Sequence, residues 1–131
     1  MERISERLQE TRKAHKTLSE ALDQESLSNL ERDGAIQRFE YTFESVWKMA
    51  RVYLLEYEGI TANSPKTCFR SLGEMNILSE EETIEALKMA DDRNLTVHMY
   101  IEEVAIQIFS HLKSYASLIE KIIRRIEKAI N

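Results

Sequence analysis

A long apolar stripe near the end of the chain largely determines its fold class. Apolar side chains recur there three or four positions apart, at Ile101, Val104, Ala105, Ile108, Leu112, Ile119, Ile122, Ile123 and Ile126. This spacing puts them on one face of an α-helix, and a face of this length is stable in water when other helices cover it. We therefore expect a last helix from about Met99 to Ala129.

Two more apolar stripes with helical spacing come earlier in the chain. One runs from about Ile4 to Leu22 and is thin, so that this helix can pack late or against a partner. The other begins at Asn29 or Asp33 and ends at Glu58, before Gly59, which suits a helix stop. Its broad apolar face predicts the spine of the core and consists of Ile36, Phe39, Phe43, Trp47, Ala50 and Leu54.

Two shorter helices are expected between residues 65 and 92. The first starts at Pro65, since proline is favoured at the first helical position, and runs to about Leu72 before Gly73. The second starts with a serine cap at Ser79 followed by acidic residues, which favour the positive end of a helix, and it runs toward Asp92.

The composition agrees with a purely helical fold. Three glycines and one proline in 131 residues leave too few turns for a many-stranded sheet. The length lies in the usual range of one domain. We therefore predict one all-α domain over residues 1–131, an up-and-down bundle of about five helices.

The charge and the cysteine content limit the function. A formal net charge of −5 argues against a protein that coats nucleic acid through bulk electrostatics, so any RNA contact must be local. Cys68 is the only cysteine and cannot form an internal disulfide, which favours a reduced, cytoplasmic setting. The charged start, from Met1 to Arg7, and the lack of a long apolar run argue against secretion and membrane spanning.

Arg93, His98 and Tyr100 form the strongest candidate for chemistry, at a predicted junction before the last helix. Arginine binds phosphate through a rigid fork, and histidine transfers protons near neutral pH. Cleavage of RNA without a metal requires a base, an acid and positive charge near the phosphorus atom. One histidine cannot easily be base and acid at once, so two copies of the pair across a two-fold axis are chemically more complete. This reasoning predicts a homodimer.

A structural alternative stays open for the same residues. Arg93 could cap or salt-bridge a helix terminus, with His98 as a partly buried polar residue that begins the next helix. Glu40 and Glu44 lie beside the apolar face of the second helix. Either Glu44 pairs with Lys48 on a solvated edge, or one of the two glutamates reaches Arg93 and orients it.

The other reactive side chains are expected to be structural. His15 and His111 have no acidic or cysteine neighbours at ligand spacing, so we predict surface or core-edge histidines and no metal or cofactor. Cys68 lacks the strongly cationic setting of a nucleophile. A basic cluster on the last helix, expected to be a solvated face that complements the helix dipole, consists of Lys121, Arg124, Arg125 and Lys128.

Two stretches of the chain resemble the nucleotidyltransferase substrate-binding protein family, a branch of the HEPN superfamily that includes HepT-type toxins. Residues 32–48 are similar to the second-helix signature of that family. Residues 93–100, Arg-Asn-Leu-Thr-Val-His-Met-Tyr, match the HEPN pattern of an arginine, a polar residue, a spacer, a histidine and a tyrosine two residues later. The likeness extends from about Leu30 to Ile126.

This resemblance implies a helical bundle that dimerises and pairs with a cognate minimal nucleotidyltransferase. It implies that Arg93 and His98 are the catalytic pair of a metal-independent endoribonuclease in a toxin-antitoxin module, with Asn94 as the accompanying polar residue. Tyr100 matches the tyrosine that the partner modifies with AMP, and AMP there would add bulk and negative charge where an RNA phosphate must approach.

Two other functions remain open. One is a non-catalytic partner subunit that holds a nucleotide or docks the nucleotidyltransferase. The other is a helical homodimer with no ligand at the motif.

Overall fold

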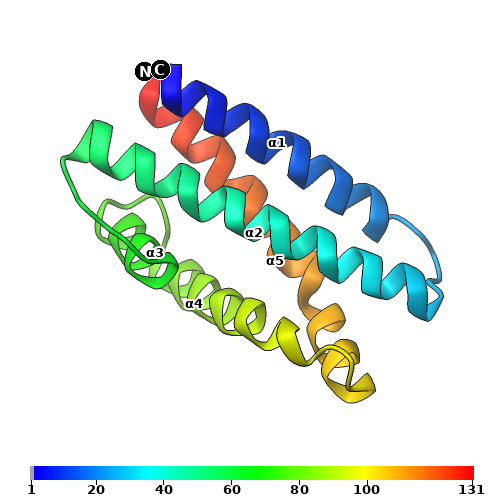
Figure 1. Ribbon diagram of the computed structural model, residues 1–131. Coiled ribbons are helices and arrows are strands. Elements are labelled where there is room, and N and C mark those ends of the chain that lie inside the picture. Colours follow the sequence, from blue (N-terminus) through cyan, green and yellow to red (C-terminus); the bar gives the residue numbers. More distant parts are fainter. Residues whose placement is uncertain (1) are drawn as a thin grey trace.

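The computed structural model describes residues 2–131, so that only residue 1 of the predicted domain lies outside the described range. Its elements, in chain order, are α1 (Glu2–Leu22), α2 (Asn29–Glu58), α3 (Pro65–Glu74), α4 (Glu80–Leu95), the short 3-10 helix η1 (Thr96–His98) and α5 (Glu102–Ile130). Figure 1 shows the start of α1 and the end of α5 at the same end of the bundle. The predicted all-α bundle of about five helices is confirmed.

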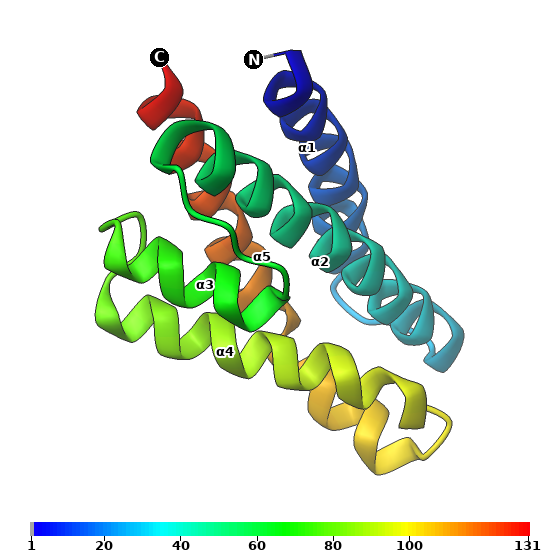
Figure 2. The same cartoon turned by 60° about the vertical axis from the view of Figure 1, so that its left-hand side comes forward.

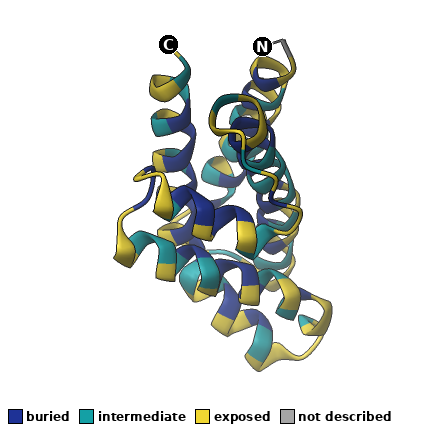
Figure 3. Cartoon of the chain, turned by 90° about the vertical axis from the view of Figure 1, so that its left-hand side faces the viewer, coloured by how far each residue is buried: buried dark blue, intermediate teal, exposed yellow. Residues whose placement is uncertain are grey.

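The three long helices pack together around the core. α2 packs against α1 and α5 and also meets the shorter helices α3 and α4. Its apolar face is buried as predicted, including Phe39 and Phe43, whereas Trp47 is half-buried at the edge. Figure 3 shows buried residues facing inward along the helices and exposed residues on the outside and at the turn between α4 and α5.

The stripe on α1 is buried within the chain itself. Ile4, Leu8, Leu18 and Leu22 are all buried, and α1 packs against both α2 and α5. The thin stripe is sufficient because α1 lies across two long helices. In the described structure α1 therefore needs no partner to cover its apolar face.

Side-chain caps begin three of the helices, and the sequence predicted the one at Ser79. Ser28 forms a capping box with Glu31 at the start of α2, and Ser79 forms one at the start of α4. Ser64 caps α3, whose first residue is proline. Gly59 ends α2 with a φ of 68°, in the left-handed region that glycine adopts without strain.

The loop after α2 brings the start of α3 back to the middle of the bundle. Figure 2 shows residues 59–64 running back beside α2, so that α3 points broadly the same way as α2 before α4 reverses. Six extended residues can span about 20 Å, which is enough for this return. The loop places the first residues of α3 next to the second half of α4.

Gly73 does not end α3, as the sequence suggested; the helix continues to Glu74. A Cβ atom at Gly73 would lie 2.5 Å from Thr83 Oγ1 on α4. The glycine therefore permits the close approach of α3 and α4 rather than acting as a stop signal.

The boundaries around the candidate motif also differ from the prediction. α4 continues through Leu95, so that Arg93 lies inside a helix and not at a junction. The last helix begins at Glu102 instead of Met99, because the backbone tightens into η1 and then extends at Ile101. Thr96 stabilises this change, since its hydroxyl donates to the carbonyl oxygen of Arg93 at 2.7 Å.

Candidate functional site

Arg93 lies in the last turn of α4 and is held by two carboxylates from α2. Its Nη1 is 3.5 Å from Glu40 Oε2, and its Nε is 4.0 Å from Glu44 Oε2. Nη1 also donates to Thr96 Oγ1 at 3.1 Å. Of the two alternatives that the sequence left open, the approach to Arg93 is therefore the one present, and both glutamates take part.

The arginine retains unused donors. Its Nε is buried and has no hydrogen-bond partner, because the nearest carboxylate oxygen lies too far away. Glu44 instead accepts from Trp47 Nε1 at 3.3 Å. Among residues 2–131 no ion pair joins Glu44 to Lys48. The glutamate contacts Arg93 and Trp47 instead.

His98 and Tyr100 lie beside each other beyond the end of α4. Their ring centroids are 6.3 Å apart in an edge-on arrangement. His98 is exposed in η1, and 80% of Tyr100 is exposed. The alternative in which His98 begins the next helix as a partly buried residue is wrong, because the chain turns through η1 before α5 begins.

Apolar side chains are exposed around this turn. Val97, Ile101 and Ile106 are all exposed, with Val97 at 66%. An ion pair of 2.8 Å between Arg32 and Glu102 holds the start of α2 against the start of α5, at the same end of the bundle. We call Val97, Tyr100, Ile101 and Ile106 the turn patch.

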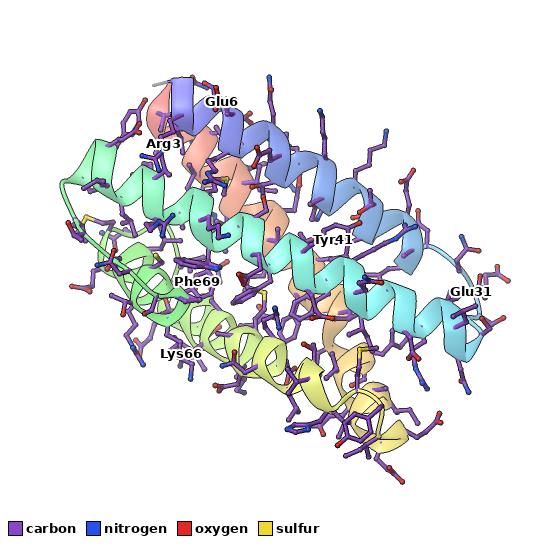
Figure 4. All side chains as sticks on the ribbon, viewed as in Figure 1. Arg3, Glu6, Glu31, Tyr41, Lys66 and Phe69 are labelled. Carbon is purple, nitrogen blue, oxygen red and sulfur yellow. The ribbon has the colours of Figure 1, made fainter. Side chains whose placement is uncertain are left out.

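A pocket of about 400 Å³ lies on the other side of Arg93, between α2, the start of α3 and the second half of α4. Its lining consists of Phe43, Glu44, Ser64, Pro65, Lys66, Ala90, Arg93 and Asn94. Figure 4 labels Lys66 near α4 and Phe69 between α3 and α2. Arg93 and Asn94 thus face one pocket together, whereas His98 is not part of its lining.

Asp92 is a buried charged residue that sequence reasoning missed. Its Oδ2 accepts a hydrogen bond from the Tyr115 hydroxyl at 2.6 Å and lies 2.8 Å from His111 Nδ1. Burial and the bond to Asp92 raise the pKa of Tyr115. His111 is thus a core-edge histidine, as predicted, but it has an acidic neighbour 19 residues away in sequence. The spacing of His111 and Tyr115, four apart on α5, was the available signal.

His15 and Cys68 have structural surroundings. His15 Nε2 lies 2.9 Å from the carbonyl oxygen of Ala116, between α1 and α5. Burial raises the pKa of the Cys68 thiol to about 11, so that it is protonated at neutral pH. Within residues 2–131, no group of three or more His, Cys, Asp or Glu side chains is arranged to hold a metal ion.

The basic cluster on α5 is not a simple solvated face. Arg125 Nη1 lies 2.6 Å from Glu82 Oε1, and Nη2 donates to Oε2 at 3.1 Å. Lys121 also approaches Glu82, at 3.8 Å. The hydrogen bonds from Arg125 lower the pKa of Glu82 to about 2. Arg125 and Lys121 therefore join α5 to the first turn of α4, whereas Arg124 pairs with Glu120 on its own helix.

Comparisons with known proteins place this geometry in a family context. A family described as nucleotidyltransferase substrate binding protein like matches residues 6–128. A protein from Thermus thermophilus, known from a crystal structure, is 48% identical and superposes with a TM-score of 0.86 over 88% of this chain and 98% of that chain. No curated protein matches the chain. In the described residues, no helix has the length and apolar character needed to cross a membrane.

Proposed function

The chain belongs to the nucleotidyltransferase substrate binding protein like family, and from this premise we propose that it is the helical component of a two-component toxin-antitoxin module with a small nucleotidyltransferase. Within that module it acts as a metal-independent endoribonuclease of the HEPN type. The observation that supports this activity most directly is the placement of Arg93. Two carboxylates fix it in the last turn of a helix, directly before an exposed histidine and an exposed tyrosine.

The proposed reaction is an internal transesterification at one phosphorus atom of the RNA backbone. The 2′-hydroxyl of RNA attacks the adjacent phosphorus while a neutral His98 takes its proton. The bond from phosphorus to the 5′-oxygen breaks, and a protonated His98 of a second copy gives its proton to that oxygen. Arg93 stabilises the negative charge on the non-bridging oxygens, and the products carry a 2′,3′-cyclic phosphate and a 5′-hydroxyl.

A homodimer would complete this site. His98 is exposed in one copy, and among residues 2–131 no hydrogen bond joins it to Arg93. The turn patch exposes apolar side chains on the same turn and on the first turns of α5, and a second copy can cover them. A two-fold axis at this patch would bring two imidazoles to one phosphate, with one as base and the other as acid.

Tyr100 is the proposed point of regulation. Its phenol is 80% exposed, so that the active site of a partner enzyme can reach its oxygen. When the nucleotidyltransferase uses ATP, the phenol loses its proton to solvent, its oxygen attacks the α-phosphorus, pyrophosphate leaves and AMP stays on the tyrosine. The added phosphate would repel RNA beside His98, which lies against Tyr100.

An RNA cleavage assay in EDTA tests the activity. We expect the purified protein to cleave RNA, His98→Ala to abolish cleavage and Arg93→Ala to lower it strongly, while circular dichroism stays helical. His15→Gln is the matched control, because it removes a histidine between α1 and α5 and should leave cleavage unchanged. Cleavage that persists in His98→Ala would refute the proposed site.

Co-expression with the partner nucleotidyltransferase tests the regulation. Mass spectrometry should show one added AMP on the wild-type protein and none on Tyr100→Phe. Tyr41→Phe, on an exposed tyrosine of α2, should be labelled as fully as the wild type. Equal labelling of Tyr100→Phe and the wild type would rule out Tyr100.

A non-catalytic partner subunit is the second candidate function. The pocket beside Arg93 favours it, since a nucleotide could occupy that pocket without contact to His98. This candidate predicts a stable complex with the nucleotidyltransferase in size-exclusion chromatography and no RNA cleavage by either the complex or the free protein. The two assays together separate the two functions.

A further inference from the structure

The pocket beside Arg93 has no role in the cleavage reaction as described. It holds about 400 Å³, within the usual size range of small-ligand sites, and it opens between three helices. Three of its lining residues can donate hydrogen bonds through charged or amide groups, namely Lys66, Arg93 and Asn94. One carboxylate, Glu44, faces the same space.

The lining charge favours an anion. Two cations and one carboxylate give the lining itself a net charge of +1, and Glu40 and Asp91 pair with these two cations from outside the lining. Arg93 keeps its buried Nε without a partner, and among the described residues its Nη2 makes no hydrogen bond. Nη2 is thus the guanidinium donor that can reach a phosphate oxygen in the pocket, whereas the buried Nε faces Glu44 at 4.0 Å.

The Lys66 ammonium can move from its ion pair on α4 to a phosphate in the pocket. Its Nζ is paired with Asp91 Oδ1 on α4, and 40% of the lysine side chain is exposed. Ion pairs this exposed are weak, so that a phosphate in the pocket can take the ammonium from Asp91 at small cost. Asp91 is therefore a competitor for the lysine and holds it at the pocket while the pocket is empty.

We propose that this pocket binds a phosphate of the RNA strand next to the one that is cleaved, through Lys66, Asn94 and Nη2 of Arg93. This inference rests on the proposed endoribonuclease function and extends it to a second binding position. Arg93 contacts both the phosphate in the pocket and the phosphate that is cleaved. It therefore links the pocket to the reaction beyond the end of α4. Lys66 is then a residue that positions the strand and takes no part in proton transfer.

Fluorescence anisotropy with a short labelled RNA that carries 2′-O-methyl sugars measures binding without cleavage, since the attacking hydroxyl is blocked. We expect Lys66→Gln to raise the Kd by about three- to tenfold at low salt and to reduce the salt slope of log K by about 0.7, the value for one phosphate contact on a single strand. Lys66→Arg should restore both, and Asp91→Asn should tighten binding because the competitor is gone.

Lys113→Gln is the matched control, since it removes the same charge from an exposed position on α5 outside the pocket. An equal salt slope for Lys66→Gln and Lys113→Gln would overturn the proposal, because the lysine would then act only through net charge. In a second arm, 5′-AMP replaces the RNA. Tighter, Lys66-dependent binding of AMP than of RNA would assign the pocket to a free nucleotide and overturn the RNA assignment.

Failure of this proposal is distinct from failure of the proposed function. If RNA cleavage depends on His98 while RNA binding ignores Lys66, the pocket assignment is wrong and the nuclease stands. If RNA binding depends on Lys66 and the protein never cleaves, the pocket is a phosphate site in a non-catalytic protein and the nuclease is wrong.

Discussion

Asp92 and Arg93 follow each other in α4, yet their side chains tie this helix to two different neighbours. Asp92 accepts from Tyr115 on α5, and Arg93 reaches Glu40 on α2. Consecutive residues in a helix point about 100° apart, so that the pair fixes the rotation of α4 between the two long helices. The buried anchor at Asp92 therefore sets the direction in which Arg93 points.

Substitution of Asp92 should affect both the fold and the site. Asp92→Ala leaves the Tyr115 hydroxyl buried without its acceptor, and we expect the free energy of unfolding to fall by about 1–3 kcal/mol. RNA cleavage should fall as well, measured where the variant is fully folded. Tyr115→Phe keeps the ring stacked on Phe39 and should cost only about 1 kcal/mol, with cleavage retained. Urea denaturation that gives Asp92→Ala the stability of the wild type would contradict this role.

The sequence predicts the helices well because their signals are local. The serine cap at Ser79, the start of a helix at Pro65 and the stop at Gly59 depend on neighbouring residues alone, and the structure has them where they were expected. Gly73 was misread because its function depends on Thr83, on another helix. Local patterns cannot distinguish a glycine that ends a helix from one that admits a neighbouring helix.

The candidate site was predictable in part for the same reason. The motif from Arg93 to Tyr100 is contiguous, and Glu40 and Glu44 share one helix face, so that their approach to Arg93 could be expected. The pairs of Asp92 with Tyr115 and of Lys66 with Asp91 join distant segments. Their formation depends on how the loop 59–64 returns and on how α4 is rotated, which no local pattern records.

Acid should weaken the contact between α4 and α5 through Glu82. Arg125 lowers the folded-state pKa of Glu82 to about 2, below its ordinary value of 4.5. The ionised carboxylate therefore stabilises the fold above pH 4.5, and this contribution is lost as the pH falls from 4.5 toward 2. Because Arg125 is partly exposed, we expect the ionised Glu82 to contribute about 1–2 kcal/mol to the free energy of unfolding.

Glu82→Gln tests this contribution. Its free energy of unfolding at pH 7 should be lower than that of the wild type by this amount, and the difference should shrink at pH 3. Glu81→Gln, at an exposed position in the same helical turn, should behave like the wild type at both pH values. If the free energy of unfolding of Glu82→Gln were lower than that of the wild type by the same amount at every pH, the charge of Glu82 would not be the cause of the loss.

Alanine in place of two helical glycines should change the free energy of unfolding in opposite directions. Gly73→Ala would place a Cβ 2.5 Å from Thr83 Oγ1, which donates to the Ser79 carbonyl oxygen, and we expect a loss of about 1–3 kcal/mol. A Cβ at Gly34 would meet nothing within 4 Å, so that Gly34→Ala should gain about 0.5–1 kcal/mol from helix propensity. In a Thr83→Ala background, the loss at Gly73 should largely disappear. Thermal denaturation of the four variants checks these signs.

Substitution of the carboxylates around Arg93 should change kcat and KM differently and so separate turnover from binding. Glu40→Gln with Glu44→Gln frees the guanidinium and removes two negative charges near the RNA, so that KM should fall. The kcat should fall by about tenfold to a hundredfold, since Arg93 is no longer held in one direction. Removal of the same charge from α1, with Glu6→Gln and Glu20→Gln, should leave kcat unchanged. A kcat equal to that of the wild type in the first pair would exclude an orienting role.

Mixed dimers should reveal whether one site uses two copies of His98. If base and acid come from different copies, a dimer of one wild-type and one His98→Ala subunit lacks one of them and is inactive. Cleavage should then fall with the square of the wild-type fraction, to about a quarter when half of the subunits are wild type. Independent sites in each copy would give a linear fall, to about half. Mixtures of the wild type with His15→Gln, prepared by the same co-refolding, should keep full activity and show that mixing itself does no harm.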